Sequence, residues 1–346
     1  MRRHQLRPPE KVDTTMSYRV DPRDIPATRV ALLAALVDGD LATAYLIATT
    51  LLDDGVSFEA LVAEVLGPVQ RELGVRWAQG ELTVADEHAA TAASEDLVTL
   101  LTGGLTSADG PLVAVVCPEG DAHSLPARVV AAVLAIRGYR SLLLGPSLPA
   151  VDLDDYLARE TPFAVALSVS LPAALYRAAA SVATVHEHGV PVVVGGRALG
   201  ADEWLVHQLG GDAWADTAGA AADILDEWQT HPPKPLTTSV APPQECLAID
   251  HHRAALIAAA VPPDEDEAGK DLVDEVSRLL DVVQGALLLD RPSLLTDQLA
   301  TVHGIRTGHG TSEAALERVL ARLVNAASEP LPATAALLRA GGAHKR

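Results

Sequence analysis

The sequence predicts a multidomain protein that combines α and α/β parts: a four-helix bundle cap, a doubly wound parallel sheet domain and an all-helical C-terminal domain. Three observations predict this fold class. Apolar residues recur at helical spacing before residue 106, short β-branched runs alternate with helical segments up to residue 230, and helical spacing returns after a proline-rich stretch. A chain of 346 residues has room for two or three domains.

The expected boundaries follow these changes of pattern. The first residues hold Pro8-Pro9 and several basic side chains, which is typical of a flexible tail. We therefore expect a tail over 1–26, a helical cap over 27–106, a sheet domain over 110–230, a proline-rich linker over 231–244 and an all-helical domain over 245–340.

The cap region has the spacing of amphipathic helices. One helix carries an apolar face made of Leu61, Val65, Leu66, Val69 and Leu73. Asp40 and Ser57 are expected N-caps, and Gly55 and Gly80 are expected helix ends. Four helices of this size predict a bundle.

The sheet region repeats strand and helix in a regular order. Strands are expected at about 111–117, 140–144, 163–169 and 190–194, and helices at about 150–160, 173–188 and 199–209. This order is typical of a Rossmann-like, flavodoxin-like unit of parallel strands.

Small and ligating side chains follow three of these strands. Asp121 and His123 come after the first strand, at the edge where open α/β sheets build ligand sites. Asp121 could accept a hydrogen bond from the imidazole nitrogen that does not face a metal, which fixes the tautomer. Ser168 and Ser170 end the third strand and Gly195-Gly196 the fourth, where small residues leave a slot.

This pattern resembles the cobalamin-binding domains of methionine synthase, the mutases and related corrinoid proteins, which carry Asp-x-His-x-x-Gly, Ser-x-Leu and Gly-Gly. The resemblance implies that His123 is the lower cobalt ligand. It also implies that the serines and Gly195-Gly196 line a slot for the displaced benzimidazole tail. Two positions depart from the pattern: Pro126 stands where the family has Gly, and Ser170 where it has Leu.

A second motif lies in the cap, where Trp77 is followed ten residues later by Glu87-His88. It resembles the helical cap of light-responsive cobalamin repressors, which encloses the upper, adenosyl face of the cofactor. An indole can cover the adenosyl group, and Glu87 can accept hydrogen bonds from sugar hydroxyls. Those repressors often carry a His after the Trp that binds cobalt once light has removed the adenosyl group. Here Ala78 takes that place, so an upper axial ligand would have to be His88 or another residue.

The linker is followed by five expected helices, at about 245–260, 264–289, 292–304, 312–327 and from 332. The order of domains resembles that of photocobilins, cobalamin photoreceptors with a globin-like helical domain that also binds biliverdin. The resemblance implies a bilin site, for which arginines could pair with propionates and imidazoles could bond the pyrrole nitrogens. The candidate residues are Cys246, which could form a thioether, and His251, His252, Arg253, Arg291, His303, Arg306 and His309.

Composition argues against several other classes of protein. The net charge of −20 and a pI near 4.9 argue against a nucleic-acid surface, and no helix-turn-helix pattern precedes the cap. No apolar run is long enough to span a membrane, and no signal peptide is recognisable. With only two cysteines, a disulfide framework is not expected, which favours a cytoplasmic protein.

We interpret the chain as a light sensor and not an enzyme, with adenosylcobalamin between cap and sheet domain and biliverdin as second chromophore. Because no output domain is recognised, we expect a homo-oligomer whose state depends on light, and a separate downstream protein. Two alternatives stay open: a corrinoid methyl carrier for methyltransferases, and a regulator that senses cobalamin without light.

Overall fold

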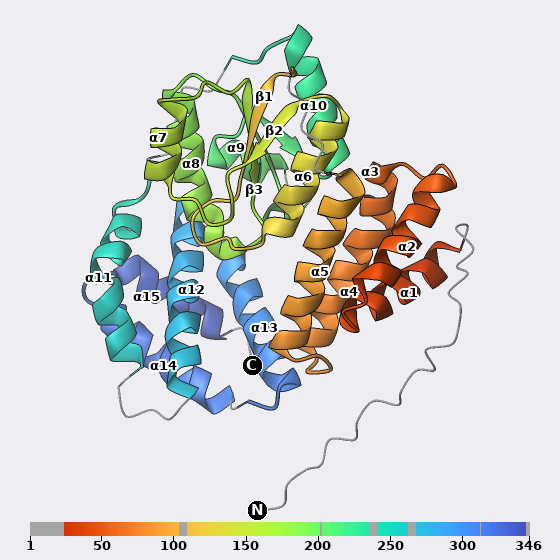
Figure 1. The fold of residues 1–346 in the computed structure, drawn as a ribbon. Helices are drawn as coiled ribbons and strands as arrows, with labels where there is room; N and C mark the ends of the chain where they lie inside the picture. Colours follow the sequence, from red (N-terminus) through yellow and green to blue (C-terminus); the bar gives the residue numbers. More distant parts are fainter. Residues whose placement is uncertain are drawn as a thin grey trace, which may run out of the picture.

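The computed structural model describes residues 24–103, 109–200, 203–234, 241–261, 268–311 and 313–343. Figure 1 shows a helical cap, a sheet region with helices on both faces, and a C-terminal helical region that lies against both. The predicted fold class is confirmed. The expected tail lies almost wholly outside the described residues.

The cap is a bundle whose members begin where the capping residues predict. Its helices are α1 (Ile25–Val37), α2 (Leu41–Asp53), α3 (Phe58–Leu61), α4 (Gly67–Ala78) and α5 (Val84–Thr102), with the π-helical segment η1 (Val62–Leu66) joining α3 to α4. The Asp40 side chain accepts from the N–H of Thr43, and Ser57 accepts from Ala60. Gly55 and Gly80 have positive φ values of 91° and 75°, as expected of residues that end helices.

The π-helical segment has a local cause. Pro68 has no N–H, so the carbonyl of Glu64, four residues earlier, loses its helical partner. The side chain of Arg29 on α1 donates to that carbonyl instead, with Nε 2.6 Å from the oxygen. The long third helix of the bundle is therefore irregular where α1 crosses it.

The sheet is parallel, and its strand order reverses beside the first strand. In the part of the chain that the structure describes, five strands lie in the order β2-β1-β3-β4-β5. They are β1 (Leu112–Val116), β2 (Arg140–Leu143), β3 (Ala164–Ser168), β4 (Val192–Gly195) and β5 (Ala213–Ala215). The chain leaves β1 on one side to form β2 and returns on the other to form β3, and ligands of open α/β sheets bind at such a switch point.

Each face of the sheet has its own core. The residues of β1 alternate between them: Val113 and Val115 pack with the helices α6 and α10 and with the cap, whereas Ala114 and Val116 pack with the helices α7, α8 and α9. These helices are α6 (Ser124–Ile136), α7 (Ala150–Leu157), α8 (Leu175–Glu187), α9 (Glu203–Leu209) and α10 (Ala218–Thr230), with the short 3₁₀ turns η2 (Pro172–Ala174) and η3 (Arg197–Leu199). Strand β5 was not among the predicted strands, because three residues carry no readable alternation.

The C-terminal region consists of α11 (Gln244–Ala260), α12 (Ala268–Leu288), α13 (Ser293–Gly308), α14 (Glu313–Ala327) and α15 (Pro332–Ala343). Its core is aliphatic and includes the buried side chains of Leu279, Val283, Leu295 and Leu323. Helix α12 packs against η2 and α8 of the sheet region, and α13 packs against α4 of the cap. Within the described ranges, no helix is both long and apolar enough to cross a bilayer.

Burial on α6 predicts a large difference between two neighbouring positions. Leu134 is fully buried between the sheet and the cap, whereas Ile136 is 43% exposed. Leu134→Ala should lower the free energy of unfolding by about 2–5 kcal/mol, because it removes buried methyl groups and leaves a cavity. Ile136→Ala should change it by less than about 0.5 kcal/mol. Urea denaturation followed by circular dichroism tests this, and equal effects of the two variants would contradict the described packing.

Candidate functional site

His123 stands at the carboxyl edge of the sheet, as the N-cap of α6 directly after the β1 loop. Its Nδ1 lies 3.2 Å from Oδ1 of Asp121, and its backbone N–H donates to the same oxygen at 3.1 Å. Asp121 is fully buried, whereas the imidazole is about half exposed, at 53%. Because Asp121 holds Nδ1, Nε2 is the nitrogen left to bind a metal, which is the arrangement expected from the sequence.

Asp121 also ties this loop to the one after β3. Its Oδ2 accepts the backbone N–H of Ser170 at 2.5 Å and that of Leu171 at 3.2 Å. These hydrogen bonds offset the free-energy cost of removing the carboxylate from water. The side chain that orients His123 therefore also fixes the backbone beside the predicted slot, a role the sequence did not indicate.

Small residues end β3 and β4, where the sequence predicts a slot. Ser168 and Ser170 are each 6% exposed, and the Ser170 hydroxyl has no hydrogen-bond partner among the described residues. Gly196 has φ 120°, and a Cβ there would collide with the backbone of Val169. A Cβ on Gly195 would lie 2.5 Å from the carbonyl oxygen of Ala215. The packing of neighbouring strands thus requires both glycines, besides any approach of a ligand.

The upper-face candidates lie at one end of the cap. Trp77 is in the last turn of α4, and Glu87 and His88 are in the first turns of α5, which Thr83 and Asp86 begin with a capping box. Nε2 of His88 lies 3.7 Å from Oε2 of Glu87, and the imidazole is 74% exposed. The indole Nε1–H of Trp77 is shielded from solvent and has no hydrogen-bond partner in the described part of the chain.

Two contacts between cap and sheet region were missed by the sequence analysis. Glu95 of α5 accepts a hydrogen bond from the hydroxyl of Ser124, the residue after His123. At the other end of the interface, Arg137 of α6 donates to Glu59 of α3 at 2.8 Å, a hydrogen bond that lowers the pKa of Glu59. Glu95 lies eight residues after Glu87 and so on the same side of α5, a spacing that could have identified it.

The bilin candidates divide into two groups. On α11, Arg253 bonds Asp281 at 2.6 Å and Gln284 at 2.9 Å, and the rings of His251 and His252 meet edge to face at 5.1 Å.

On α13, Arg306 bonds Glu275 at 2.8 Å and His303 lies 3.1 Å from Glu313, while His309 lies against Trp77 of the cap with 5.8 Å between ring centroids. Arg291 lies over the ring of Trp204, 5.5 Å from its centroid. Two of the three arginines expected to pair with propionates, Arg253 and Arg306, thus pair with carboxylates of this chain.

Cys246 is fully buried, and its thiol lies 3.5 Å from the carbonyl oxygen of Gln284. Burial, with the charges of Asp250 and Glu245, raises the pKa of this thiol to about 11. Since the thiolate is the nucleophile, the structure does not favour the thioether considered from the sequence.

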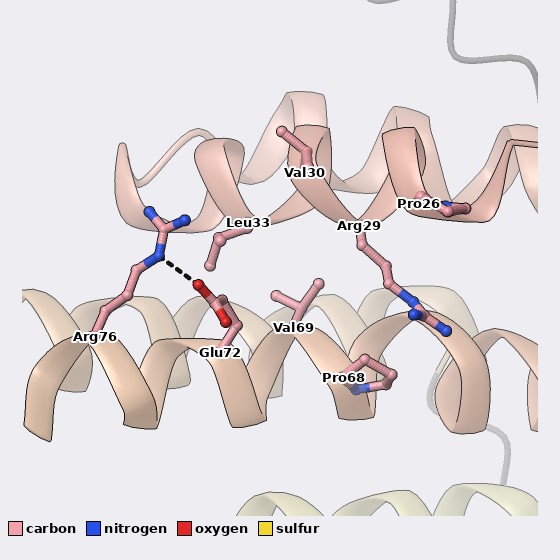
Figure 2. A pocket seen from close by; sticks show the side chains of 8 residues that line it. All are labelled: Pro26, Arg29, Val30, Leu33, Pro68, Val69, Glu72 and Arg76. Carbon is pink, nitrogen blue, oxygen red and sulfur yellow. Dashed lines mark hydrogen bonds and ion pairs between the residues drawn. The ribbon is translucent and has the colours of Figure 1, made fainter.

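A groove on the cap lies apart from these residues. Figure 2 shows it between α1 and α4, with an ion pair between Arg76 and Glu72 of α4 at one end. Its volume is about 380 Å³. None of the predicted site residues is among its lining: Pro26, Arg29, Val30, Leu33, Pro68, Val69, Glu72 and Arg76.

Comparison with known proteins identifies the class. Two protein-family profiles, each described as a B12 binding domain, match residues 29–102 and residues 111–225. These are the cap and the sheet region, so both parts of the chain match B12 binding domains, which supports cobalamin binding. The half-exposed imidazole of His123 and the buried hydroxyl of Ser170, which has no partner among the described residues, fit such a cofactor.

Among individual relatives, the chain is similar to the HTH-type transcriptional repressor CarA of Myxococcus xanthus. They are 35% identical over 192 residues, which are 52% of this chain and 62% of the relative. A monomethylamine corrinoid protein of Methanosarcina barkeri has a similar solved structure, with 21% identity and a TM-score of 0.49 over 57% of this chain and 95% of the other. A cobalamin-binding protein of Desulfitobacterium hafniense matches with 20% identity and a TM-score of 0.33, over 60% and 98% of the two chains.

The buried cysteines predict that the folded protein does not react with thiol reagents. Burial, with Asp121 and Glu95 nearby, raises the pKa of Cys117 to about 12, and that of Cys246 is about 11. At pH 8 both thiols stay protonated, so neither should react with a thiol reagent such as DTNB until the protein is unfolded, when both should. Rapid labelling of Cys246 in the folded protein, located by mass spectrometry, would show that this thiol is accessible after all.

Proposed function

We propose that this protein is a light sensor that holds adenosylcobalamin between the cap and the sheet region. The observation that carries the proposal is the pair of Asp121 and His123 at the carboxyl edge of the sheet: Asp121 holds Nδ1, so Nε2 of the half-exposed imidazole is the nitrogen left for a metal. The similarity to CarA supports a regulatory role over an enzymatic one. When bound, adenosylcobalamin supplies a cobalt–carbon bond that light breaks.

On the lower side, the proposal gives each residue one task. His123 binds cobalt through Nε2, and Asp121 fixes the tautomer and the orientation of the ring. The Ser170 hydroxyl is buried without a partner, so it can donate to or accept from the nucleotide tail in the slot. Ser168 and the two glycines leave the space for that tail.

On the upper side, Trp77 covers the adenosyl group and Glu87 accepts hydrogen bonds from its sugar. Glu87 is only partly exposed and already accepts from the hydroxyl of Thr91 at 2.9 Å, so its carboxylate is held in place on α5. His88 is the more exposed neighbour, and it is our candidate for the upper cobalt position after light.

The cap–sheet interface supplies the two states that a switch requires. The contact between Glu95 and Ser124 joins α5 to the loop that carries His123, while Arg137 and Glu59 join α6 to α3. Without the adenosyl group, Trp77 and Glu87 would lose their contacts with the ligand, whereas Arg137 would keep its contact with Glu59. The cap can therefore shift at the ligand end while its other end stays attached.

The proposal extends to output and to a second chromophore. We propose a cytoplasmic homo-oligomer whose state changes with light, a separate downstream protein, and noncovalent binding of biliverdin by the C-terminal helical region. A corrinoid methyl carrier, or a regulator that senses cobalamin without light, would share the lower site, and its oligomeric state would not change with light.

Removal of the lower ligand should have a larger effect than removal of its partner. We expect His123→Ala to lose histidine ligation and most cobalamin affinity, and Asp121→Ala to lower affinity by about 10- to 100-fold. His207→Ala is a matched control, because His207 lies in the same region with the same 53% exposed side chain. Absorption titrations with cobalamin measure this. An unchanged spectrum and affinity in His123→Ala would refute the assignment of the ligand.

Green light should change the purified protein loaded with adenosylcobalamin. We expect an altered visible spectrum and a shifted elution volume in size-exclusion chromatography, both weakened in Trp77→Ala because the indole no longer covers the adenosyl group. A spectrum that responds while the elution volume does not would favour the light-independent regulator or the carrier.

Biliverdin added to the full chain should give a red-absorbing band that cobalamin cannot produce. The absence of this band would exclude the bilin part of the proposal alone.

A further inference from the structure

The C-terminal helical region lies against both sides of the candidate site. On the lower side, a Cβ added to Gly285 of α12 would be 3.6 Å from the carbonyl oxygen of Pro172, which closely follows the backbone held by Asp121. Arg177 of α8 bonds Asp250 of α11 at 2.8 Å and lies 3.9 Å from Glu119 in the loop before His123. This region therefore contacts η2, which follows the β3 loop, and is joined through Arg177 to the loop that precedes His123.

On the upper side, the end of α13 interlocks with the end of α4. A Cβ added to Gly308 would collide with the carbonyl oxygen of Ala78, and a Cβ added to Gly80 would collide with the carbonyl oxygen of Gly308. Two backbone turns from distant parts of the chain thus meet without side chains between them. Such an approach requires glycine on both sides and fixes the position of the residue that follows.

That residue is His309, and its imidazole lies against the indole of Trp77. The ring centroids are 5.8 Å apart and the planes are tilted by 55°. His309 is exposed, and in the described part of the chain its side chain makes no hydrogen bond or ion pair. The neighbouring indole N–H is shielded and also lacks a partner. Two polar groups without partners therefore lie side by side at the turn expected to cover the upper face.

We propose that His309 is a ligand-contacting residue of the upper face, so that the cobalamin site is built from three regions of the chain and not two. This inference rests on the proposed function. It removes His309 from the bilin candidates and assigns it, with Trp77, to the adenosyl group above the cobalamin ring. It also gives the C-terminal helical region a direct contact with the group whose loss is the signal.

Two matched pairs of variants of the full chain test this inference. His309→Ala is compared with His303→Ala, which removes another imidazole of α13 that pairs with Glu313. Gly308→Ala, which forces α13 away from α4, is compared with Gly304→Ala, where an added Cβ meets nothing within 4 Å. Affinities for adenosylcobalamin and hydroxocobalamin are measured in the dark by absorption, and tryptophan fluorescence without cobalamin reports on the indole contact.

We expect His309→Ala to lower the affinity for adenosylcobalamin by about two- to ten-fold and to leave the affinity for hydroxocobalamin unchanged. The reason is that only adenosylcobalamin carries the group that the imidazole contacts. Gly308→Ala should also lower the affinity for adenosylcobalamin. The control variants His303→Ala and Gly304→Ala should bind both cobalamins as the parent protein does. The fluorescence should change in His309→Ala and not in His303→Ala. If Gly308→Ala does not fold, His309→Ala decides.

Three results would overturn the inference. Parental affinities in His309→Ala would refute it and leave the proposed function intact. Equal losses for both cobalamins would show that His309 only supports the structure. A parent protein that binds neither cobalamin would refute the proposed function itself, and the inference with it.

Discussion

The arrangement of the site depends on one buried carboxylate. Asp121 accepts from the imidazole and backbone of His123 with one oxygen, and from the backbone of Ser170 and Leu171 with the other. Removing a carboxylate from water is costly, and these donors offset that cost only while the loops after β1 and β3 keep their positions. The orientation of the candidate ligand and the position of the backbone beside the predicted slot are therefore linked, because Asp121 holds both.

The three parts of the chain also contact one another directly. Ser124, next to the candidate ligand, bonds Glu95 of the cap, and η2, after the loop that Asp121 holds, packs against α12. The end of α13 then meets the end of α4 at Gly80 and Gly308. A change in the position of the cap would therefore alter contacts with both other regions.

Local features were predictable from the sequence because they depend on local chemistry. The caps at Asp40 and Ser57, the placement of His123 after a buried strand and the contact with Asp121 all follow from residue types at short spacing. Long-range features were not: Asp121 bonds Ser170 across 49 positions, and Gly308 meets Ala78 across 230. The bilin candidates show the same limit, because their residue types were suggestive whereas the fold pairs Arg253 and Arg306 with carboxylates.

The central proposal is that His123 would bind the cobalt of cobalamin. Electron paramagnetic resonance of the protein loaded with the Co(II) form of cobalamin tests it most directly, since a single axial nitrogen splits the cobalt lines. A ¹⁴N ligand gives triplets and a ¹⁵N ligand gives doublets. Protein labelled with ¹⁵N-histidine should show doublets with unlabelled cobalamin, and His123→Ala should abolish them. Triplets that persist in the labelled protein would show that the nitrogen belongs to the cofactor, and the account of the lower face would be wrong.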